Sequence, residues 1–289
     1  MRKALLAFVP VAAALAVVAT ATGAHRSAAA IPGCATGSLN LLTSGTLTVG
    51  ADNPAFPPWF GGDQKKPWKV SDPNSGKGYE SAVAYAVAKQ LGFAKTAVKW
   101  TYVPFSNSFR PGKKPFDFYI TQVSITPERA KAITFSKPYY FVNQAVVGRK
   151  GQPIASVRSV AGLKKFKLGA QLGTTSYQYI VNRIKPSSKP LVFDSNDLAV
   201  QALKNGQLDG LVVDLPTAFY VTAVQVSDGT IVGQFPSGAS KEGFGLVLAK
   251  GNPLVTCVNK AIDRLWANGT IKTLQRIWLA KATGAPVLK

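Results

Sequence analysis

Apolar residues along this chain recur with two periods, one typical of buried strands and one typical of helices. Short apolar runs at residues 46–50, 98–103 and 116–124 predict strands, and the first two flank a helix over 78–91. The apolar stripe of this helix consists of Tyr79, Val83, Val87 and Leu91, and Gly92 ends it. A strand, a helix and further strands in this order predict a parallel sheet with helical crossovers.

A second set of elements follows, and it repeats the same alternation. The predicted strands cover residues 167–171, 191–193, 208–213, 231–235 and 244–249, and the predicted helices cover 174–184, 196–204 and a segment that starts at Pro216. Two amphipathic helices end the chain, with apolar stripes formed by Leu254, Val258, Ile262 and Leu265 and by Ile271, Leu274 and Trp278. The pattern therefore predicts two α/β units followed by trailing helices.

The first 30 residues have the composition of a secretory signal peptide. Arg2 and Lys3 precede an Ala-rich apolar run over 4–18, and Ala28–Ala30 supplies small residues for cleavage. An uncleaved membrane anchor is the alternative, but the run contains Pro10 and is barely long enough to cross a bilayer. We therefore expect an exported protein, located in the periplasm or at the outer face of the cytoplasmic membrane.

The chain contains two cysteines, Cys34 and Cys257. In an exported protein an even pair favours a disulfide, and this one would close a very long loop. The alternative is a lipid anchor at Cys34, although Pro32 fits poorly in a lipoprotein cleavage box. The single histidine, His25, lies in the leader, so we expect no metal site and no cofactor.

Basic residues greatly outnumber acidic ones, with 34 Lys and Arg against 13 Asp and Glu and a net charge of +21. The lysines are scattered in short pairs such as Lys65–Lys66, Lys113–Lys114 and Lys164–Lys165, without interleaved aromatic residues. This distribution favours a solvated surface attracted to anionic lipid or cell wall over a nucleic-acid site. We expect a monomer of two modest domains that does not bind nucleic acid.

The segment Gln122–Arg129 has the features of an anion-binding turn. Thr126 is a good helix N-cap and Pro127 suits the first helical position, so a strand ending near Ser124 leads into a short helix. Free N–H groups, the hydroxyl of Ser124 and the guanidinium of Arg129 then suit one small carboxylate, held bidentately.

Together with Phe135–Tyr140 (Phe-Ser-Lys-Pro-Tyr-Tyr), this segment resembles the extracytoplasmic amino-acid-binding proteins of ABC importers, the bacterial solute-binding protein family 3. The resemblance runs from about Thr46 to Trp278. It implies an α/β, two-lobed periplasmic-binding-protein fold of type 2. Each lobe is then a mostly parallel sheet flanked by helices, and ligand binds in the cleft between them.

The resemblance also implies how the chain divides between the lobes. Two crossing segments are expected near residues 141–148 and 240–245, and the trailing helices return to the first lobe. Lobe 1 then comprises residues 31–143 plus 246–289, and lobe 2 comprises residues 144–245.

The same resemblance assigns roles to residues at the ends of the predicted strands. Arg129 would hold the α-carboxylate of the ligand, Thr174 and Thr175 would help from the opposite lobe, and Asp214 would accept hydrogen bonds from the ammonium. From the residues alone, an ordinary capped helix after Gly173 is an equal alternative for the two threonines. Asp214 follows an apolar strand and precedes Pro216, which also suits an acid at a helix start.

Five further residues complete the expected site. Phe56 and Trp59, held stiffly among prolines, would pack against the side chain of the ligand, although a loop plug over the core is the alternative for Trp59. Gln122 and Ser124 would donate hydrogen bonds to the ligand. Glu80 matches a recurrent acid of the family near the cleft mouth.

These expectations describe a binding protein that captures a free amino acid and delivers it to the permease of an ABC transporter. They do not describe an enzyme, because a Ser–His–Asp set is impossible without a histidine in the mature chain. The alternative is an exported dehydratase-type enzyme on the same fold, acting on a cyclic carboxylic acid. Glu80 is the only acid or base that we can name for such chemistry.

Overall fold

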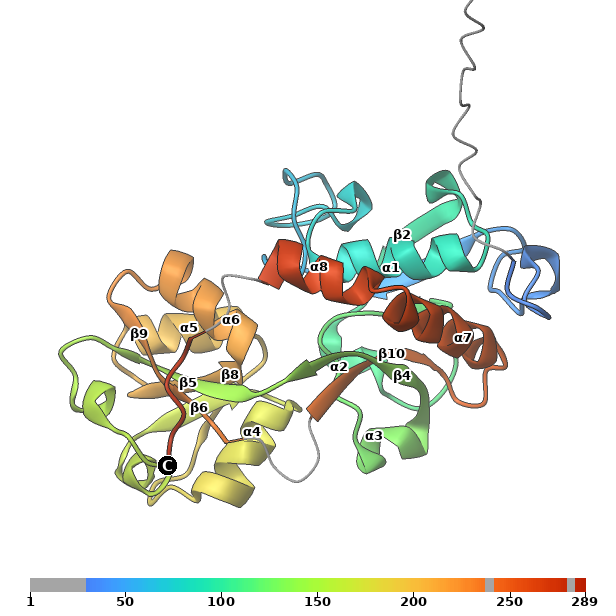
Figure 1. The fold of residues 1–289 in the computed structure, drawn as a ribbon. Coiled ribbons are helices and arrows are strands. Elements are labelled where there is room, and N and C mark those ends of the chain that lie inside the picture. Colours follow the sequence, from blue (N-terminus) through green and yellow to red (C-terminus); the bar gives the residue numbers. More distant parts are fainter. Residues whose placement is uncertain (1–29, 237–241, 280–283) are drawn as a thin grey trace, which may run out of the picture.

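The protein folds into two lobes, each built on its own five-stranded sheet (Figure 1). The computed structural model describes residues 30–236, 242–279 and 284–289. The predicted signal peptide therefore lies almost entirely outside the described residues. Within the described part of the chain, no helix is long and apolar enough to cross a membrane.

The sheet of lobe 1 has the strand order β2-β1-β3-β10-β4. Its strands are β1 (Leu47–Ala51), β2 (Val98–Tyr102), β3 (Phe118–Tyr119), β4 (Ile133–Val142) and β10 (Glu242–Ala249). β1 pairs in parallel with β2 and β3, whereas β10 is antiparallel to β3 and β4. The strand expected over residues 116–124 is thus much shorter, and the long strand β4 was not predicted.

Three long helices cover one face of this sheet: α1 (Tyr79–Gln90), α7 (Leu254–Ala267) and α8 (Thr270–Leu279). Their apolar stripes pack together with β1 and β10, as the helical periodicity predicts. The short helices α2 (Phe105–Ser108) and α3 (Pro127–Ala132) belong to the other side, where the buried side chains include Phe116, Tyr119 and Ile133. The trailing helices thus return to the first lobe.

The sheet of lobe 2 has the strand order β7-β6-β8-β5-β9. Its strands are β5 (Gln144–Arg149), β6 (Leu168–Gln171), β7 (Leu191–Phe193), β8 (Gly210–Asp214) and β9 (Gly229–Gln234). The helices α5 (Asn196–Lys204) and α6 (Leu215–Tyr220) pack on one face, and α4 (Thr175–Tyr179) packs on the other. β6 is parallel to β7 and β8, so the carboxyl ends of these strands meet at one edge.

Short helical turns join these elements. Five are 3-10 turns, at Thr36–Ser38, Pro73–Ser75, Lys95–Ala97, Pro153–Ser156 and Ala161–Lys165. Two are π-helical continuations of α4 and α6, at Ile180–Ile184 and Val221–Gln225. The helix predicted over 174–184 is therefore a single α-helical turn that widens into a π-helix.

Two segments cross between the lobes side by side. β4 leads into β5 through Asn143, and β10 begins at Glu242, which pairs with Val142. The first crossing lies within the expected range 141–148, and the second overlaps the expected range 240–245, of which residues 240 and 241 are outside the described residues.

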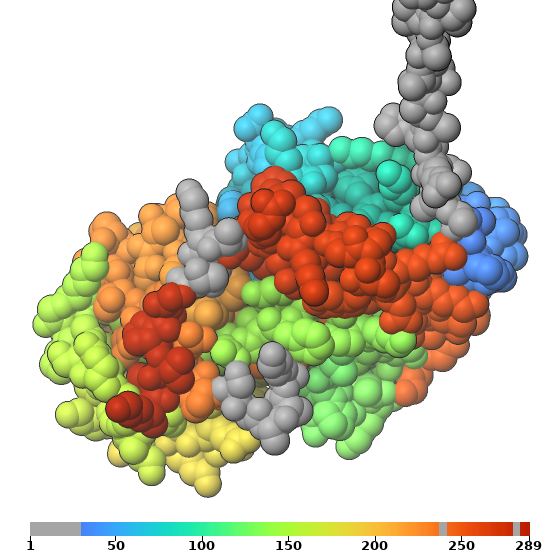
Figure 2. All heavy atoms as spheres, viewed as in Figure 1, coloured from blue at the N-terminus to red at the C-terminus, as the bar shows by residue number. Residues whose placement is uncertain are grey.

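The C-terminal residues form a further connection, because they lie on lobe 2 although α8 belongs to lobe 1 (Figure 2). Val287 bridges to Gln234 of β9, and the backbone of Lys289 pairs with Arg158 and Val160. Leu288 is buried in the lobe 2 core. The expected assignment of residues 246–289 entirely to lobe 1 needs correction here, since the apolar Leu288 is buried only against lobe 2.

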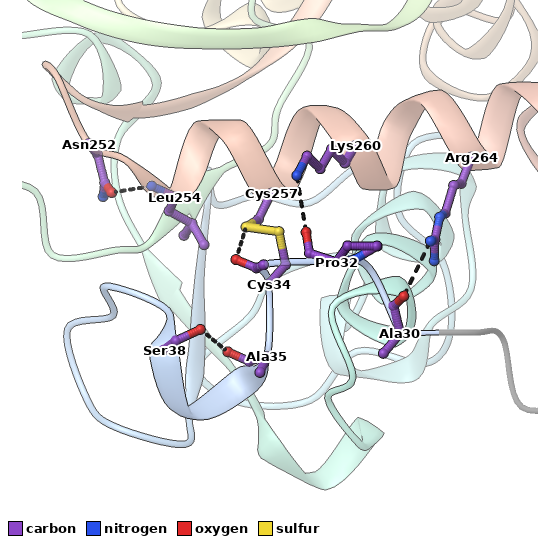
Figure 3. Close-up of a disulfide and its surroundings, with 11 residues drawn as sticks. Ala30, Pro32, Cys34, Ala35, Ser38, Asn252, Leu254, Cys257, Lys260 and Arg264 are labelled. Carbon is purple, nitrogen blue, oxygen red and sulfur yellow. Dashed lines mark hydrogen bonds between the residues drawn. A yellow bond between two sulfur atoms is a disulfide. The ribbon is translucent and has the colours of Figure 1, made fainter.

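The predicted disulfide between Cys34 and Cys257 is present and ties the start of the described chain to α7 (Figure 3). The bond occupies the sulfur that a lipid anchor at Cys34 would require. Lys260 donates to the carbonyl oxygen of Pro32 at 3.0 Å, and Arg264 donates to that of Ala30 at 3.3 Å. The N-terminal segment is thereby fixed to lobe 1.

Candidate ligand-binding site between the lobes

A cleft of about 820 Å³, counting the space open to solvent, lies between the lobes. Both lobes line it, chiefly with residues that follow the carboxyl ends of strands. The residues that line it include Asp52, Phe56, Phe105, Gln122, Ser124, Arg129, Gln144, Gln171, Thr174, Thr175, Ser195, Asn196, Asp197 and Asp214.

Arg129 is held at the cleft wall by the short helix α3. Thr126 caps this helix by accepting a hydrogen bond from the backbone N–H of Arg129, as the sequence predicts. The guanidinium donates to the carbonyl oxygens of Ser124 at 2.7 Å and of Gly173 in lobe 2 at 2.8 Å. Burial lowers the pKa of Arg129 to about 10, so the group stays cationic at neutral pH.

Two aromatic rings support the guanidinium, since its carbon lies 4.6 Å from the ring centre of Phe109 and 5.6 Å from that of Phe105. Two of the five N–H donors of Arg129 are used by the carbonyl oxygens. Arg129 also lines the cleft, so its guanidinium borders the space that an anion would enter.

A hydroxyl-rich cluster adjoins Arg129 and spans both lobes. Ser124 of lobe 1 and Thr175 of lobe 2 each donate their hydroxyl proton to the carboxylate of Glu242, at 2.5 and 2.7 Å. The side-chain amide of Gln144 also donates to both oxygens of Glu242, at 3.2 Å. Thr174 caps α4 and lines the cleft beside this cluster.

Asp214 ends β8 and caps α6, so the strand and the helix together aim its carboxylate at the cleft. It accepts hydrogen bonds from the backbone N–H of Thr217 at 3.0 Å and from the Thr217 hydroxyl at 2.7 Å. Burial nevertheless raises the pKa of Asp214 to about 6. Arg129 and Asp214 thus line one cleft, an arrangement of opposite charges that suits a zwitterion.

Gln122 lines the cleft in a left-handed backbone conformation, with φ of 43°. Glu80 holds it there by accepting hydrogen bonds from its backbone N–H, at 2.7 Å, and from its side-chain amide. Glu80 itself is fully buried, also accepts from the hydroxyl of Tyr139, and is not part of the cleft wall. Burial raises the pKa of Glu80 to about 7.

The two aromatic residues expected at the site lie in different places. Phe56 lines the cleft, and its ring centre lies 5.9 Å from that of Tyr220 in lobe 2. Trp59 is buried outside the cleft wall among aromatic rings, yet its indole N–H donates across the lobes to the hydroxyl of Thr217 at 3.1 Å. Trp59 therefore reaches the site through Thr217, whose backbone N–H and hydroxyl both donate to Asp214.

Sequence reasoning missed three acids at or beside the cleft. Asp52 follows β1 and Asp197 lies in the first turn of α5 after β7, and both line the cleft. Burial raises the pKa of Asp52, and the charge of Asp197 adds to this shift. Their positions after strand ends are a signal that could have identified them. Glu242, at the crossing into β10, carries no such signal.

The model of one known family matches residues 59–281, more than half of the chain: the bacterial extracellular solute-binding proteins, family 3. The chain belongs to this family. Its relatives include the L-cystine-binding protein TcyJ of Escherichia coli (strain K12), which is 28% identical over 85% of each chain. They also include ABC transporter arginine-binding protein 1 of the same organism, 27% identical over 70% of this chain and 81% of the relative.

Solved structures support the same family assignment. An ancestral arginine-binding protein bound to arginine has a TM-score of 0.65 and 33% identity, over 81% of this chain and 98% of the other. The ancestral amino acid-binding protein AncCDT-1, a precursor of cyclohexadienyl dehydratase, has a TM-score of 0.65 and 28% identity, over 81% of this chain and 95% of the other. The two-lobed fold predicted from the sequence is thereby confirmed.

Among the residues that the structure describes, no group of three or more His, Cys, Asp or Glu side chains could hold a metal ion. The polar groups that line the cleft are the guanidinium of Arg129, several carboxylates, hydroxyls and side-chain amides.

Proposed function

We propose that this solute-binding protein captures an amino acid with a cationic side chain and delivers it to the permease of an ABC importer. The observation that carries the proposal is the charge of the cleft. In a chain with only 13 acidic residues against 34 basic ones, Asp52, Asp197 and Asp214 all line one cleft, where Arg129 is the one guanidinium among the described residues.

The backbone end of the ligand would lie between Arg129 and Asp214. Arg129 offers unused N–H donors to the α-carboxylate, and such charge-assisted pairs are the stronger hydrogen bonds in proteins. Asp214 would accept from the α-ammonium, and Gln122 and Thr174 border the space between them. These contacts bind every amino acid alike and do not select among side chains.

The side chain of the ligand would extend toward Asp52 and Asp197. Asp52 belongs to lobe 1 and Asp197 to lobe 2, and repulsion between their charges contributes to the raised pKa of Asp52. A cation between them would relieve this repulsion and join the lobes. Gln171, Ser195 and Asn196 add polar partners at this end, and Phe56 offers a ring for the apolar stem. Arginine-binding proteins among the relatives agree with this assignment.

Contacts from both lobes to one ligand would stabilise the closed arrangement, which the permease would then recognise. The protein would act as a monomer outside the cytoplasmic membrane after removal of the signal peptide. Its basic surface would favour contact with anionic lipid or cell wall.

A thermal-shift screen of the mature protein, followed by calorimetry, tests the ligand class. Arginine, lysine, ornithine and histidine are compared with citrulline, glutamine, glutamate and cystine, because citrulline is the neutral isostere of arginine. We expect arginine or lysine to raise the unfolding midpoint by mass action, and citrulline to do so far less. An equal response to citrulline, a preference for glutamate, or no response at all would contradict the proposal.

Asp197→Asn sharpens this test by removing one charge from the proposed side-chain end. We expect the variant to lose most of the preference for arginine over citrulline. Asp194→Asn is the matched control, since Asp194 is an exposed acid on the same connection.

The alternative, a dehydratase acting on a cyclic carboxylic acid, has less support in the geometry. Glu80, the acid named for that chemistry, bonds to Gln122 and Tyr139 behind the cleft wall. Turnover of prephenate by the mature protein, followed by absorbance, would favour the enzyme over the binding protein.

A further inference from the structure

Glu242 lies where the second crossing segment enters lobe 1, as the first residue of β10. Its backbone is fixed by pairing with Val142 of β4. Its side chain contacts both lobes through hydrogen bonds from Ser124 and Thr175. The carboxylate therefore stands beside the same hydroxyl groups that border Arg129.

The direction of these hydrogen bonds has a chemical consequence. A hydroxyl group has a single proton to donate, and Ser124 and Thr175, whose hydroxyl oxygens lie 3.2 Å apart, both donate it to the same oxygen of Glu242. While Glu242 accepts them, the two hydroxyls present only lone pairs to the cleft. Lone pairs repel a carboxylate and attract an ammonium group.

Gln144 strengthens this arrangement. Ser176 donates to its side-chain carbonyl oxygen at 2.6 Å, which orients the amide so that its N–H₂ group faces Glu242. Gln144 is buried, so this orientation is built into the core beside the crossing. Ser124 of lobe 1 and Thr175 and Gln144 of lobe 2 thus all donate hydrogen bonds to Glu242.

The charge of Glu242 also acts on the groups at both ends of the proposed site. It favours the cationic form of Arg129 and disfavours the ionised form of Asp214. An anionic group this close to Arg129 weakens the attraction that the guanidinium exerts on a second carboxylate.

We propose that Glu242 sets the ligand affinity of this protein by competing with the ligand carboxylate for the hydroxyl protons of Ser124 and Thr175. The proposal rests on the proposed function, because it requires a ligand that carries a carboxylate. Glu242 is a positioning residue here: it acts through the two hydroxyls and keeps binding weaker, so that ligand can be released to the permease.

Glu242→Gln is the central test, because it keeps the size of the side chain and replaces its charged acceptor by the weaker, neutral oxygen of an amide. Calorimetry compares the wild type and the variant with arginine and with agmatine, which is arginine without the carboxylate. We expect the variant to bind arginine about tenfold more tightly, the order of magnitude of one charge-assisted hydrogen bond. Agmatine should bind the two proteins equally or prefer the wild type.

A double-mutant cycle with Ser124→Ala tests whether Glu242 acts through the Ser124 hydroxyl or only through the stability of the fold. If the gain arises from the freed Ser124 proton, Glu242→Gln should improve arginine binding less in the Ser124→Ala background. Glu242→Ala serves as a second variant with the same expectation if circular dichroism shows that the amide disturbs the fold.

Unchanged or weaker arginine binding by Glu242→Gln would overturn the competition. An equal gain for arginine and agmatine would also overturn it, because the effect would then not involve the carboxylate. Failure of the wild type to bind any amino acid would instead remove the proposed function itself, and the competition with it. If lysine is the better ligand, lysine and cadaverine replace arginine and agmatine.

Discussion

The guanidinium of Arg129 in lobe 1 donates a 2.8 Å hydrogen bond to the carbonyl oxygen of Gly173 in lobe 2. Gly173 directly precedes Thr174, the N-cap of α4, so the bond joins the two walls of the cleft where they approach. One side chain thus contributes to lobe contact and also lines the cleft. The two roles reinforce each other, because a ligand that engages Arg129 would favour the closed arrangement.

Arg129→Ala should abolish amino-acid binding while the protein remains folded. A charge-assisted hydrogen bond contributes roughly 1.5–3 kcal/mol, so loss of a bidentate contact should weaken affinity about 100-fold or more. Calorimetry measures the affinity, and circular dichroism checks the fold. Lys131→Ala, an exposed cation on the same helix, is the control and should bind normally. Full-strength binding by Arg129→Ala would refute the assignment.

Ligand affinity should fall as the pH drops below about 6, the pKa of Asp214. Above that pH the carboxyl group is ionised and attracts the ligand ammonium, whereas below it a proton competes with the ligand. Linkage then predicts a loss of up to about tenfold per pH unit from this one group. Calorimetry between pH 5 and pH 8 measures the slope, and Asp214→Asn should bind weakly with a flatter profile. A pH-independent wild type would contradict the role of Asp214.

Trp59→Phe should weaken ligand binding several-fold without unfolding the protein. The change removes the indole N–H that reaches Thr217 across the lobes but keeps an aromatic ring among Tyr79, Tyr140 and Phe244. A hydrogen bond contributes about 1 kcal/mol net, which sets the size of the effect. Trp100→Phe is the matched control, because its indole donates to Tyr85 within lobe 1. Equal effects of the two variants on affinity would argue against a role for the interlobe contact.

Leu288→Ala should lower the free energy of unfolding by about 2 kcal/mol, the lower part of the range for a buried leucine. Leu288 is 2% exposed in the lobe 2 core, whereas the neighbouring Val287 is 57% exposed. Val287→Ala should therefore change stability little. Urea unfolding measures the free energy of unfolding of both variants. A similar decrease in the two would show that burial of Leu288 does not stabilise the protein.

Much of the architecture could be predicted because it depends on local pattern. The helix over Asn196–Lys204 and the strand over Leu191–Phe193 have the predicted bounds, since their apolar spacing and caps are encoded within a few residues. β4 was not predicted, because Lys137 and Pro138 interrupt its apolar run and only pairing with β10 keeps it extended.

The site likewise has features that follow from local sequence and features that depend on tertiary contacts. The turn that presents Arg129 could be derived from Thr126 and Pro127, since capping is a local property. Glu80 and Trp59 were expected to face ligand, yet they lie behind the cleft wall and bond to Gln122 and Thr217. Whether a side chain in a loop or at a helix start faces the cleft or the core depends on neighbours distant in the sequence.

The sequence by itself predicted a signal peptide, and it determined the cysteine pair, the α/β alternation and the capped turn that presents Arg129, because each is written in composition or in short-range spacing. Only the tertiary structure decided that Asp52, Asp197 and Asp214 share one cleft and that Glu242 accepts the hydroxyl protons beside Arg129. These residues are brought together by the packing of two lobes around the crossing segments. Residues that interact across such long stretches of chain do not recur at a regular spacing, so the sequence pattern does not reveal them.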